Sequence, residues 1–88
     1  MQRAIGMVEF NSIARGIYAA DQMVKISEVE IVTAASTCPG KYIVIVHGDV
    51  AAVKAGTDAG EAIAQEKGLL VNSEVIPSPS ELLVPSLL

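Results

Sequence analysis

The chain's one cysteine, Cys38, is its strongest nucleophile, and it lies within the run Ser36-Thr37-Cys38-Pro39-Gly40-Lys41-Tyr42. Pro39 fixes one backbone angle and Gly40 tolerates a positive φ, so the pair predicts positions i+1 and i+2 of a type II turn. A lone cysteine commonly acts as a small buried hydrophobe. A turn with polar residues on both sides is a poor place to bury one, which favours a thiol on an exposed turn.

The other side chains that could take part in catalysis do not form a catalytic set. The only histidine, His47, precedes Gly48-Asp49, and without a second histidine or a nearby thiol it cannot build a zinc site within one chain. We expect a structural role for it. The ten Asp and Glu residues are spread singly along the chain and offer no obvious pair for acid–base catalysis. The sequence therefore predicts a protein that is not an enzyme.

A symmetric assembly of several chains would change what Cys38 can bind. Iron–sulfur clusters are held by about three or four thiolates, so one cysteine per chain suffices if several chains bring their turns to a common axis. In such an arrangement Pro39-Gly40 would keep the backbone rigid and close to the axis. Lys41 would offset the negative charge of the thiolates and cluster.

The segments on either side of the turn read as strands. Residues 29–35 and 42–46 are rich in β-branched side chains, and the second run ends at His47-Gly48. A first strand is expected over 4–10 and a more polar, edge-type strand over 69–76.

Two helices are expected between these strands. Ser12 caps the first, whose predicted inner stripe is Ile13, Ile17, Ala20 and Val24, and Asp21 pairs with Lys25 at i,i+4. Asp49 caps the second, which ends near Lys67-Gly68 and has a predicted inner face of Val50, Val53, Thr57, Gly60 and Ile63.

The end of the chain carries a third helix signal. The run Ser78-Pro79-Ser80-Glu81 has the capping-box pattern and predicts a short helix over 82–84, stopped by Pro85. The whole order of elements predicts an α+β, ferredoxin-like split βαβ fold: a four-stranded antiparallel sheet with both main helices on one face. We expect one domain over residues 1–88, with a C-terminal tail over 77–88.

The composition of the chain limits the classes of partner that we expect. The formal charge of −4 and the scattered basic residues argue against a nucleic-acid surface. Neither a membrane span nor a signal peptide is apparent, and one cysteine fits a reducing compartment, so we expect a cytoplasmic protein without membrane partners. The 51% hydrophobic content exceeds what so small a domain readily hides, which predicts a homo-oligomer.

Several motifs together resemble the bacterial microcompartment shell proteins of the single-domain, hexamer-forming class, and the resemblance covers nearly the whole chain. These motifs are Ala4-Ile5-Gly6-Met7-Val8-Glu9, Ala19-Ala20-Asp21-Gln22-Met23-Val24-Lys25, His47-Gly48-Asp49-Val50-Ala51-Ala52-Val53-Lys54-Ala55-Gly56 and Val75-Ile76-Pro77. The resemblance implies flat cyclic hexamers that tile, with other shell proteins, around encapsulated enzymes. It also implies that Lys25 lies at the edge between hexamers and that segment 36–42 lines a central pore.

Two positions depart from the family pattern. Ordinary pore loops are rich in glycine and serine, whereas this one resembles the cysteine-bearing variants of glycyl-radical-enzyme microcompartments, to which a [4Fe–4S] cluster is ascribed. Ser78 stands where many relatives carry an arginine between two prolines, which bears on the strength of lateral tiling.

Three hypotheses follow for the function. The first is a shell hexamer in which Cys38 from several subunits binds a shared [4Fe–4S] cluster for electron transfer, with Thr37, Pro39, Gly40 and Lys41 shaping the site. The second keeps the shell hexamer but leaves the pore free of a cluster, for metabolite passage. The third is a ferredoxin-like regulatory domain that binds a small ligand.

Overall fold

The computed structural model describes residues 3–37 and 39–87. Its elements, in chain order, are β1 (Ala4–Phe10), α1 (Ile13–Ile26), β2 (Glu30–Ser36), β3 (Tyr42–Gly48), α2 (Val50–Glu66), β4 (Leu70–Ile76) and α3 (Val84–Leu87). In this part of the chain four strands form one antiparallel sheet with the order β2-β3-β1-β4. The predicted α+β split βαβ fold is confirmed.

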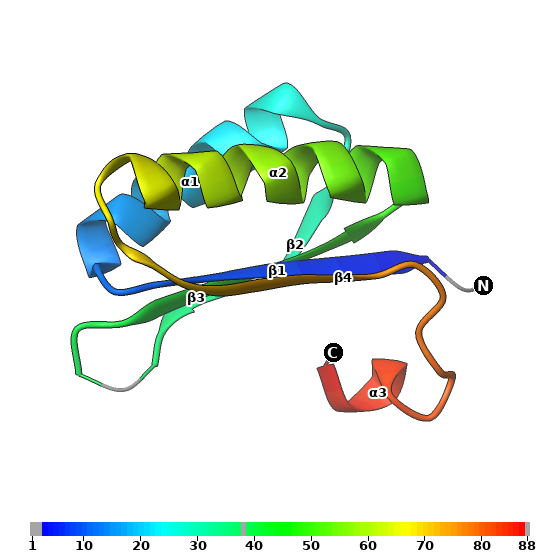
Figure 1. Ribbon diagram of the computed structural model, residues 1–88. Coiled ribbons are helices and arrows are strands. Elements are labelled where there is room, and N and C mark those ends of the chain that lie inside the picture. The colour runs from blue at the N-terminus through cyan, green and yellow to red at the C-terminus, as the bar shows by residue number, and fades with distance from the viewer. Residues whose placement is uncertain (1–2, 38, 88) are drawn as a thin grey trace.

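The molecule has two main layers (Figure 1). Helices α1 and α2 lie on one face of the sheet, whereas the short α3 lies on the opposite side, below the sheet in this view. The core fills the space between the helices and the sheet. Its largest fully buried side chains there are Phe10, Met23, Val8, Val44, Val46 and Val53.

Buried and more exposed residues alternate along the two central strands, β1 and β3, and this alternation distinguishes the two faces of the sheet. In β3, buried Tyr42, Val44 and Val46 alternate with partly exposed residues, as expected for a strand with one covered face. In β1, Gly6 faces α2 so closely that a Cβ there would lie 2.8 Å from the Val53 side chain. The residues between these positions point to the other side, which we call the open face.

The inner face of α1 differs from the prediction. The stripe of Ile13, Ile17, Ala20 and Val24 is wrong except at Ala20, because the buried residues of this helix are Gly16, Ala19, Ala20 and Met23. Small residues face inward because the helix packs closely: a Cβ on Gly16 would lie 2.6 Å from Cβ of Tyr42. The larger apolar side chains are thereby turned outward.

The second helix largely matches its prediction. Val53, Thr57 and Gly60 are buried as expected, Ile63 is half-buried, and Val50 is exposed instead. Gly60 lies against Met23 of α1, which supplies the close approach expected of a glycine in a helix interior. The predicted end is confirmed, because Gly68 has a φ of +67° directly after the last turn.

The predicted position of the third helix, over residues 82–84, is wrong. Residues 81–83 form a turn, closed by a 2.9 Å hydrogen bond from the Leu83 N–H to the Ser80 carbonyl, and α3 begins only at Val84. Pro85 thus lies in the first turn of this helix and does not end it. A proline is tolerated there because the first N–H groups of a helix have no carbonyl partner within it.

Among the described residues, no helix is both long enough and apolar enough to cross a membrane.

Candidate functional site

The turn between β2 and β3 is tightly closed on both sides of Cys38. Ser36 pairs with Tyr42 at the end of the β2–β3 ladder, and the Thr37 N–H donates to the Lys41 carbonyl at 3.0 Å. Gly40 has a φ of +80°, the left-handed conformation expected for the third residue of a type II turn. Cys38 itself lies outside the described residues.

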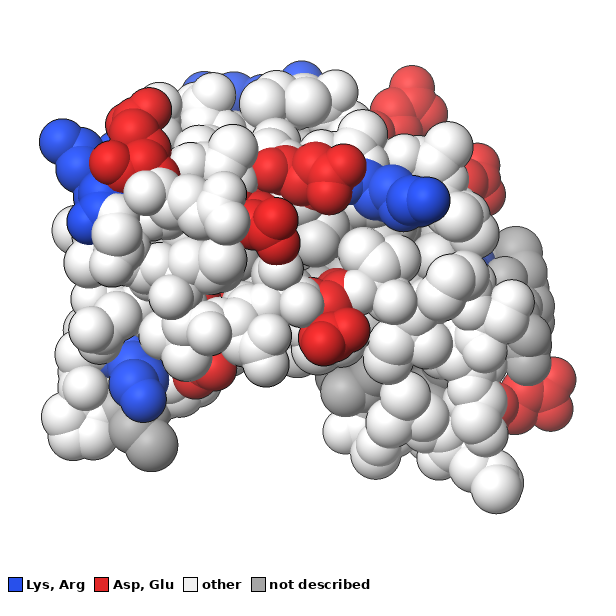
Figure 2. Space-filling view, viewed as in Figure 1, with Lys and Arg blue, Asp and Glu red and all other residues white. Residues whose placement is uncertain are grey.

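The predicted site residues on this turn share one solvent-facing location. Thr37, Pro39 and Gly40 are exposed and Lys41 is half-buried. The turn projects from the end of the sheet beyond β3 (Figure 1), and it forms one of two lobes that flank a hollow in the space-filling view (Figure 2). The backbone therefore presents segment 36–42 at a corner of the molecule, where another chain can approach it.

The donor set bears on whether a cluster fits this turn. The chain supplies one thiol, and the described residues contain no group of three or more His, Cys, Asp and Glu side chains placed to share a metal. A cluster needs about three or four thiolates. The residues present thus fit such a group only as a ring of turns from several chains.

Lys25 lies in the last turn of α1 and points into solvent. Its Nζ is 2.7 Å from a carboxylate oxygen of Asp21, so the predicted i,i+4 ion pair is confirmed. The hydrogen bond to Asp21, with the attraction between the two charges, raises the pKa of the Lys25 amine above its ordinary value of 10.5. The site geometry thus keeps this side chain charged and held to its own helix.

The outer surface of α1 carries exposed apolar side chains that the sequence analysis assigns to the interior. Ile13, Ile17 and Val24 are exposed, Ile17 to 54%, and their spacing places them on one stripe of the helix. We call these three residues the α1 patch. Tyr18 and Ile26 are 50% and 58% exposed at other positions around the helix. The sequence does hold a signal for the α1 patch, because Gly16, Ala19, Ala20 and Met23 also recur at helical spacing and form a second possible inner stripe.

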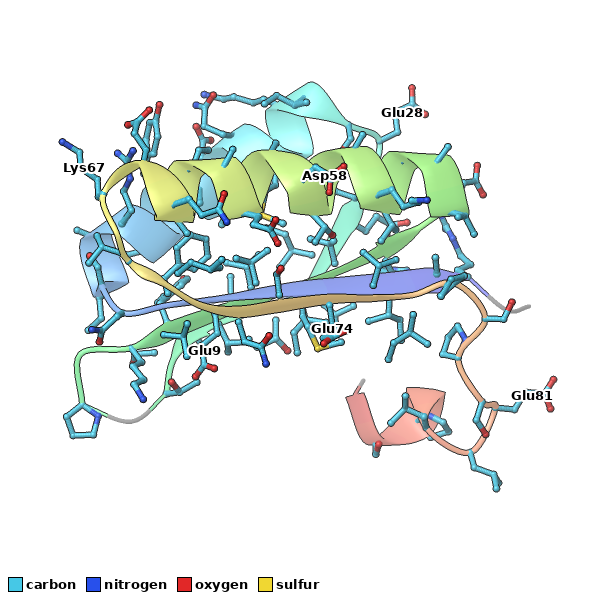
Figure 3. The ribbon with its side chains drawn as sticks, in the orientation of Figure 1. Glu9, Glu28, Asp58, Lys67, Glu74 and Glu81 are labelled. Carbon is cyan, nitrogen blue, oxygen red and sulfur yellow. The ribbon has the colours of Figure 1, made fainter. Side chains whose placement is uncertain are left out.

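The open face of the sheet combines apolar and acidic side chains. A shallow hollow of about 90 Å³ there is lined by Met7, Glu9, Ile43, Asn72, Ser73 and Glu74. Figure 3 places Glu9 and Glu74 on the side of the sheet away from α1 and α2. The hollow lies between the β2–β3 turn and the C-terminal tail, and two of its four polar lining residues are glutamates.

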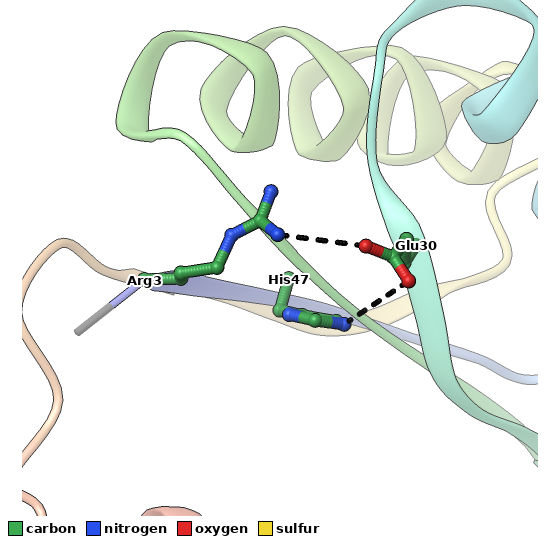
Figure 4. Close-up of polar contacts among 3 residues, drawn as sticks. All are labelled: Arg3, Glu30 and His47. Atoms are coloured by element: carbon green, nitrogen blue, oxygen red, sulfur yellow. Dashed lines mark hydrogen bonds and ion pairs between the residues drawn. The ribbon is translucent and has the colours of Figure 1, made fainter. Parts of the chain in front are cut away.

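His47, for which the sequence predicts a structural role, lies near a carboxylate of the neighbouring strand. Its Nε2 lies 4.0 Å from Oε2 of Glu30, and Oε1 of Glu30 lies 3.5 Å from Nη1 of Arg3 (Figure 4). Glu30 and His47 are also direct cross-strand partners of β2 and β3. A single carboxylate is therefore placed between a permanent cation and an imidazole.

Residues 4–79 match the model of the BMC domain family, which is most of the chain. The chain belongs to the BMC domain family. It is 47% identical over 78 residues to the bacterial microcompartment shell protein PduA of Citrobacter freundii, an alignment that covers 89% of this chain and 84% of PduA. It is 36% identical over 87 residues to the shell protein PduT of the same organism, covering 99% of this chain but only 46% of PduT.

A solved structure agrees with this assignment. The crystal structure of a microcompartment protein from Desulfitobacterium hafniense DCB superimposes with a TM-score of 0.88 at 40% identity, over 99% of this chain and 47% of that one. The chain thus spans about half the length of PduT and of this structure, and most of PduA.

Family membership confirms the coarser part of the prediction. The chain is a BMC shell-domain protein homologous to PduA and PduT, and the names of both relatives describe shell proteins, in agreement with a structural role.

Proposed function

We propose that this BMC-domain chain is a structural tile of a microcompartment shell and that six copies form a cyclic hexamer. The observation that carries the proposal is the α1 patch, whose apolar side chains remain exposed in a chain of only 88 residues. Exposed apolar surface of this kind marks protein–protein contacts. The family of the chain supplies the kind of partner, which is further copies of a shell domain.

The whole chain, residues 1–88, acts in this proposal as one shell domain with its tail at 77–88. Hexamers assemble with other shell proteins around encapsulated enzymes in the cytoplasm. Lys25 contributes to the contact between neighbouring hexamers, a role supported by its exposed amine at the end of α1. Ser78 is also exposed, but as a neutral side chain it lacks the charge that an arginine would add to that contact.

In the hexamer, the turns at 36–42 surround the central opening. The exposure of Thr37, Pro39 and Gly40 supports this placement, as does the projection of the turn from the end of the sheet. The Thr37–Lys41 hydrogen bond and the left-handed Gly40 keep the backbone of the turn compact, which supports an approach of six turns to one axis.

Cys38 residues from several subunits then bind one shared [4Fe–4S] cluster at this opening. Thr37, Pro39, Gly40 and Lys41 shape the site, and the Lys41 ammonium offsets the negative charge that thiolates bring together. Such a cluster supplies one-electron transfer, here across the shell. The proposal rests on the identity of the turn residues and on the need for thiols from more than one chain.

The anaerobic absorption and electron-paramagnetic-resonance spectra of reconstituted protein test the cluster. We expect a broad charge-transfer band and a signal of the reduced cluster, both lost in Cys38→Ser. Ala62→Ser is the matched control, because it introduces the same side chain at an exposed position of α2, outside the turn, and leaves every thiol in place. Intact hexamers without a band in either protein would contradict the cluster and leave a pore for metabolites.

A further inference from the structure

Two glutamates on the open face lie close together on adjacent strands. Glu9 of β1 and Glu74 of β4 line the shallow hollow there, and both lie on the side of the sheet away from the helices (Figure 3). The partner of Glu9 in the β1–β4 register is Asn72, two residues before Glu74, so the two carboxylates are diagonal neighbours. In the described part of the chain neither glutamate forms an ion pair. A cation from outside the chain would therefore meet both carboxylates at one place.

The apolar part of the hollow indicates which kind of cation fits it. Met7 and Ile43 line the same hollow of about 90 Å³, and both are only half-buried. A lysine side chain matches this mixture, because its methylene stem packs on apolar side chains while its ammonium group reaches carboxylates. A bound metal ion matches it less well, since the described residues hold no group of three or more His, Cys, Asp and Glu side chains placed to share one.

The chain itself offers few lysines for such a contact. Of its six basic residues, three are paired within the described part of one copy. These pairs are Arg3 with Glu30, Arg15 with Glu66 and Lys25 with Asp21. Lys41 is half-buried on the β2–β3 turn, and exposed Lys67 follows the last turn of α2, directly after Glu66. The remaining basic residue is Lys54, which is exposed near the start of α2.

The surroundings of Lys54 allow another chain to come close. Ala51 and Ala55 are its neighbours on the same side of α2, and both are exposed. Their methyl groups let a sheet approach the helix, and the longer Lys54 side chain extends beyond them. Asp58 lies one turn further along, and Ala62 lies about 10 Å beyond Ala55 along the helix axis. A contact centred on Ala51 and Ala55 therefore keeps Asp58 away from the two glutamates and leaves Ala62 outside.

We propose that Lys54 of one copy enters the hollow on the open face of the next copy and pairs there with Glu9 and Glu74. The inference rests on the proposed ring of six chains and names one of its contacts. Helix α2 and the open face belong to opposite sides of the molecule (Figure 1), so the contact joins two different surfaces. Such a heterologous contact repeats around a ring when the rotation between copies closes. It adds opposite charges to the apolar α1 patch, which lies on the same layer as α2.

Charge reversal on each side of the contact tests the pairing. We expect Lys54→Glu and Glu74→Lys each to weaken self-association about ten-fold, because like charges then meet in the contact. The chain with both changes should return to within about three-fold of the native chain, since a cation and a carboxylate face each other again. Sedimentation velocity over a concentration series measures the association. Lys67→Glu is the matched control, because it makes the same charge change at the other end of α2.

Three results would overturn the contact. They are unchanged association in Lys54→Glu, an equal loss in Lys67→Glu, and no recovery in the chain with both changes, as expected if the hollow binds a different partner. The comparison separates this contact from the number of copies. Recovery in a native assembly of another size would support the contact and contradict the hexamer, whereas native hexamers that are insensitive to Lys54→Glu would contradict the contact alone. A native chain that does not self-associate would contradict both.

Discussion

Glycine at position 16 allows α1 to lie directly on the Tyr42 side chain of β3. A Cβ added there would lie 2.5 to 2.7 Å from three carbon atoms of Tyr42, and one of these is the Tyr42 Cβ, which moves only with the strand. The absence of a side chain at this residue is therefore a packing requirement. It also explains why small residues form the inner face of α1.

Replacing Gly16 with alanine tests this requirement. In an open helix the change would stabilise by about 1 kcal/mol through helix propensity. Here we expect a net loss of about 1–2 kcal/mol in the free energy of unfolding, because overpacking outweighs propensity. Urea unfolding measures the change. Ala14→Gly, at an exposed site of the same helix, should lose stability by propensity alone, and a more stable Gly16→Ala protein would contradict the packing argument.

The Asp21–Lys25 pair gives a second test at a single residue. Because Asp21 raises the pKa of Lys25, the contribution of the pair to stability is present at neutral pH and is lost as the pH rises through the raised value. Asp21→Asn should bring the pKa of Lys25 down towards 10.5 and leave its charge at pH 7 unchanged. An NMR titration of the Lys25 side chain measures this, and an unaltered titration curve in the variant would contradict the ion pair.

At the scale of elements, α1 has two apolar sides, of which one packs within the chain and the other is exposed. Its inner side holds small residues against α2 and the sheet, and its outer side carries the α1 patch. A helix with apolar residues on both sides is expected where one side packs within the chain and the other meets a partner. The α1 patch is thus the surface on which self-association should depend most.

We expect Ile17→Glu to weaken self-association about ten-fold or more, because a carboxylate would be buried without a partner in the contact. Sedimentation velocity over a concentration series measures the change. Ala62→Glu places the same charge on an exposed position of α2 outside the α1 patch and should leave association near that of the native chain. Equal behaviour of the two variants would remove the patch from the interface.

The elements also show what could be read from the sequence. Strand positions, the Ser12 cap, the Gly68 helix end and the Pro39-Gly40 turn were predictable because each depends on local backbone chemistry. The outward side of α1 was not, because an apolar residue looks the same whether its own chain or another covers it. The start of α3 was missed because a proline both begins and ends helices.

At the scale of the whole molecule, the two faces differ in character. The face with α1 and α2 holds the α1 patch and the Asp21–Lys25 pair, and the open face holds Glu9, Glu74 and the hollow between the turn and the tail (Figures 2 and 3). Thr37 and Pro39, the sequence neighbours of Cys38, belong to a turn at one corner. Only an assembly of several chains brings such corners together, so the account of the pore depends on the number of copies.

Native mass spectrometry of the purified chain measures that number most directly. The account predicts a dominant species with six times the 9.2 kDa mass of one chain, and weaker association in Ile17→Glu than in Ala62→Glu. A dominant monomer, dimer or trimer at micromolar concentration would contradict the shell hexamer, and with it the ring of turns that the shared site at Cys38 requires.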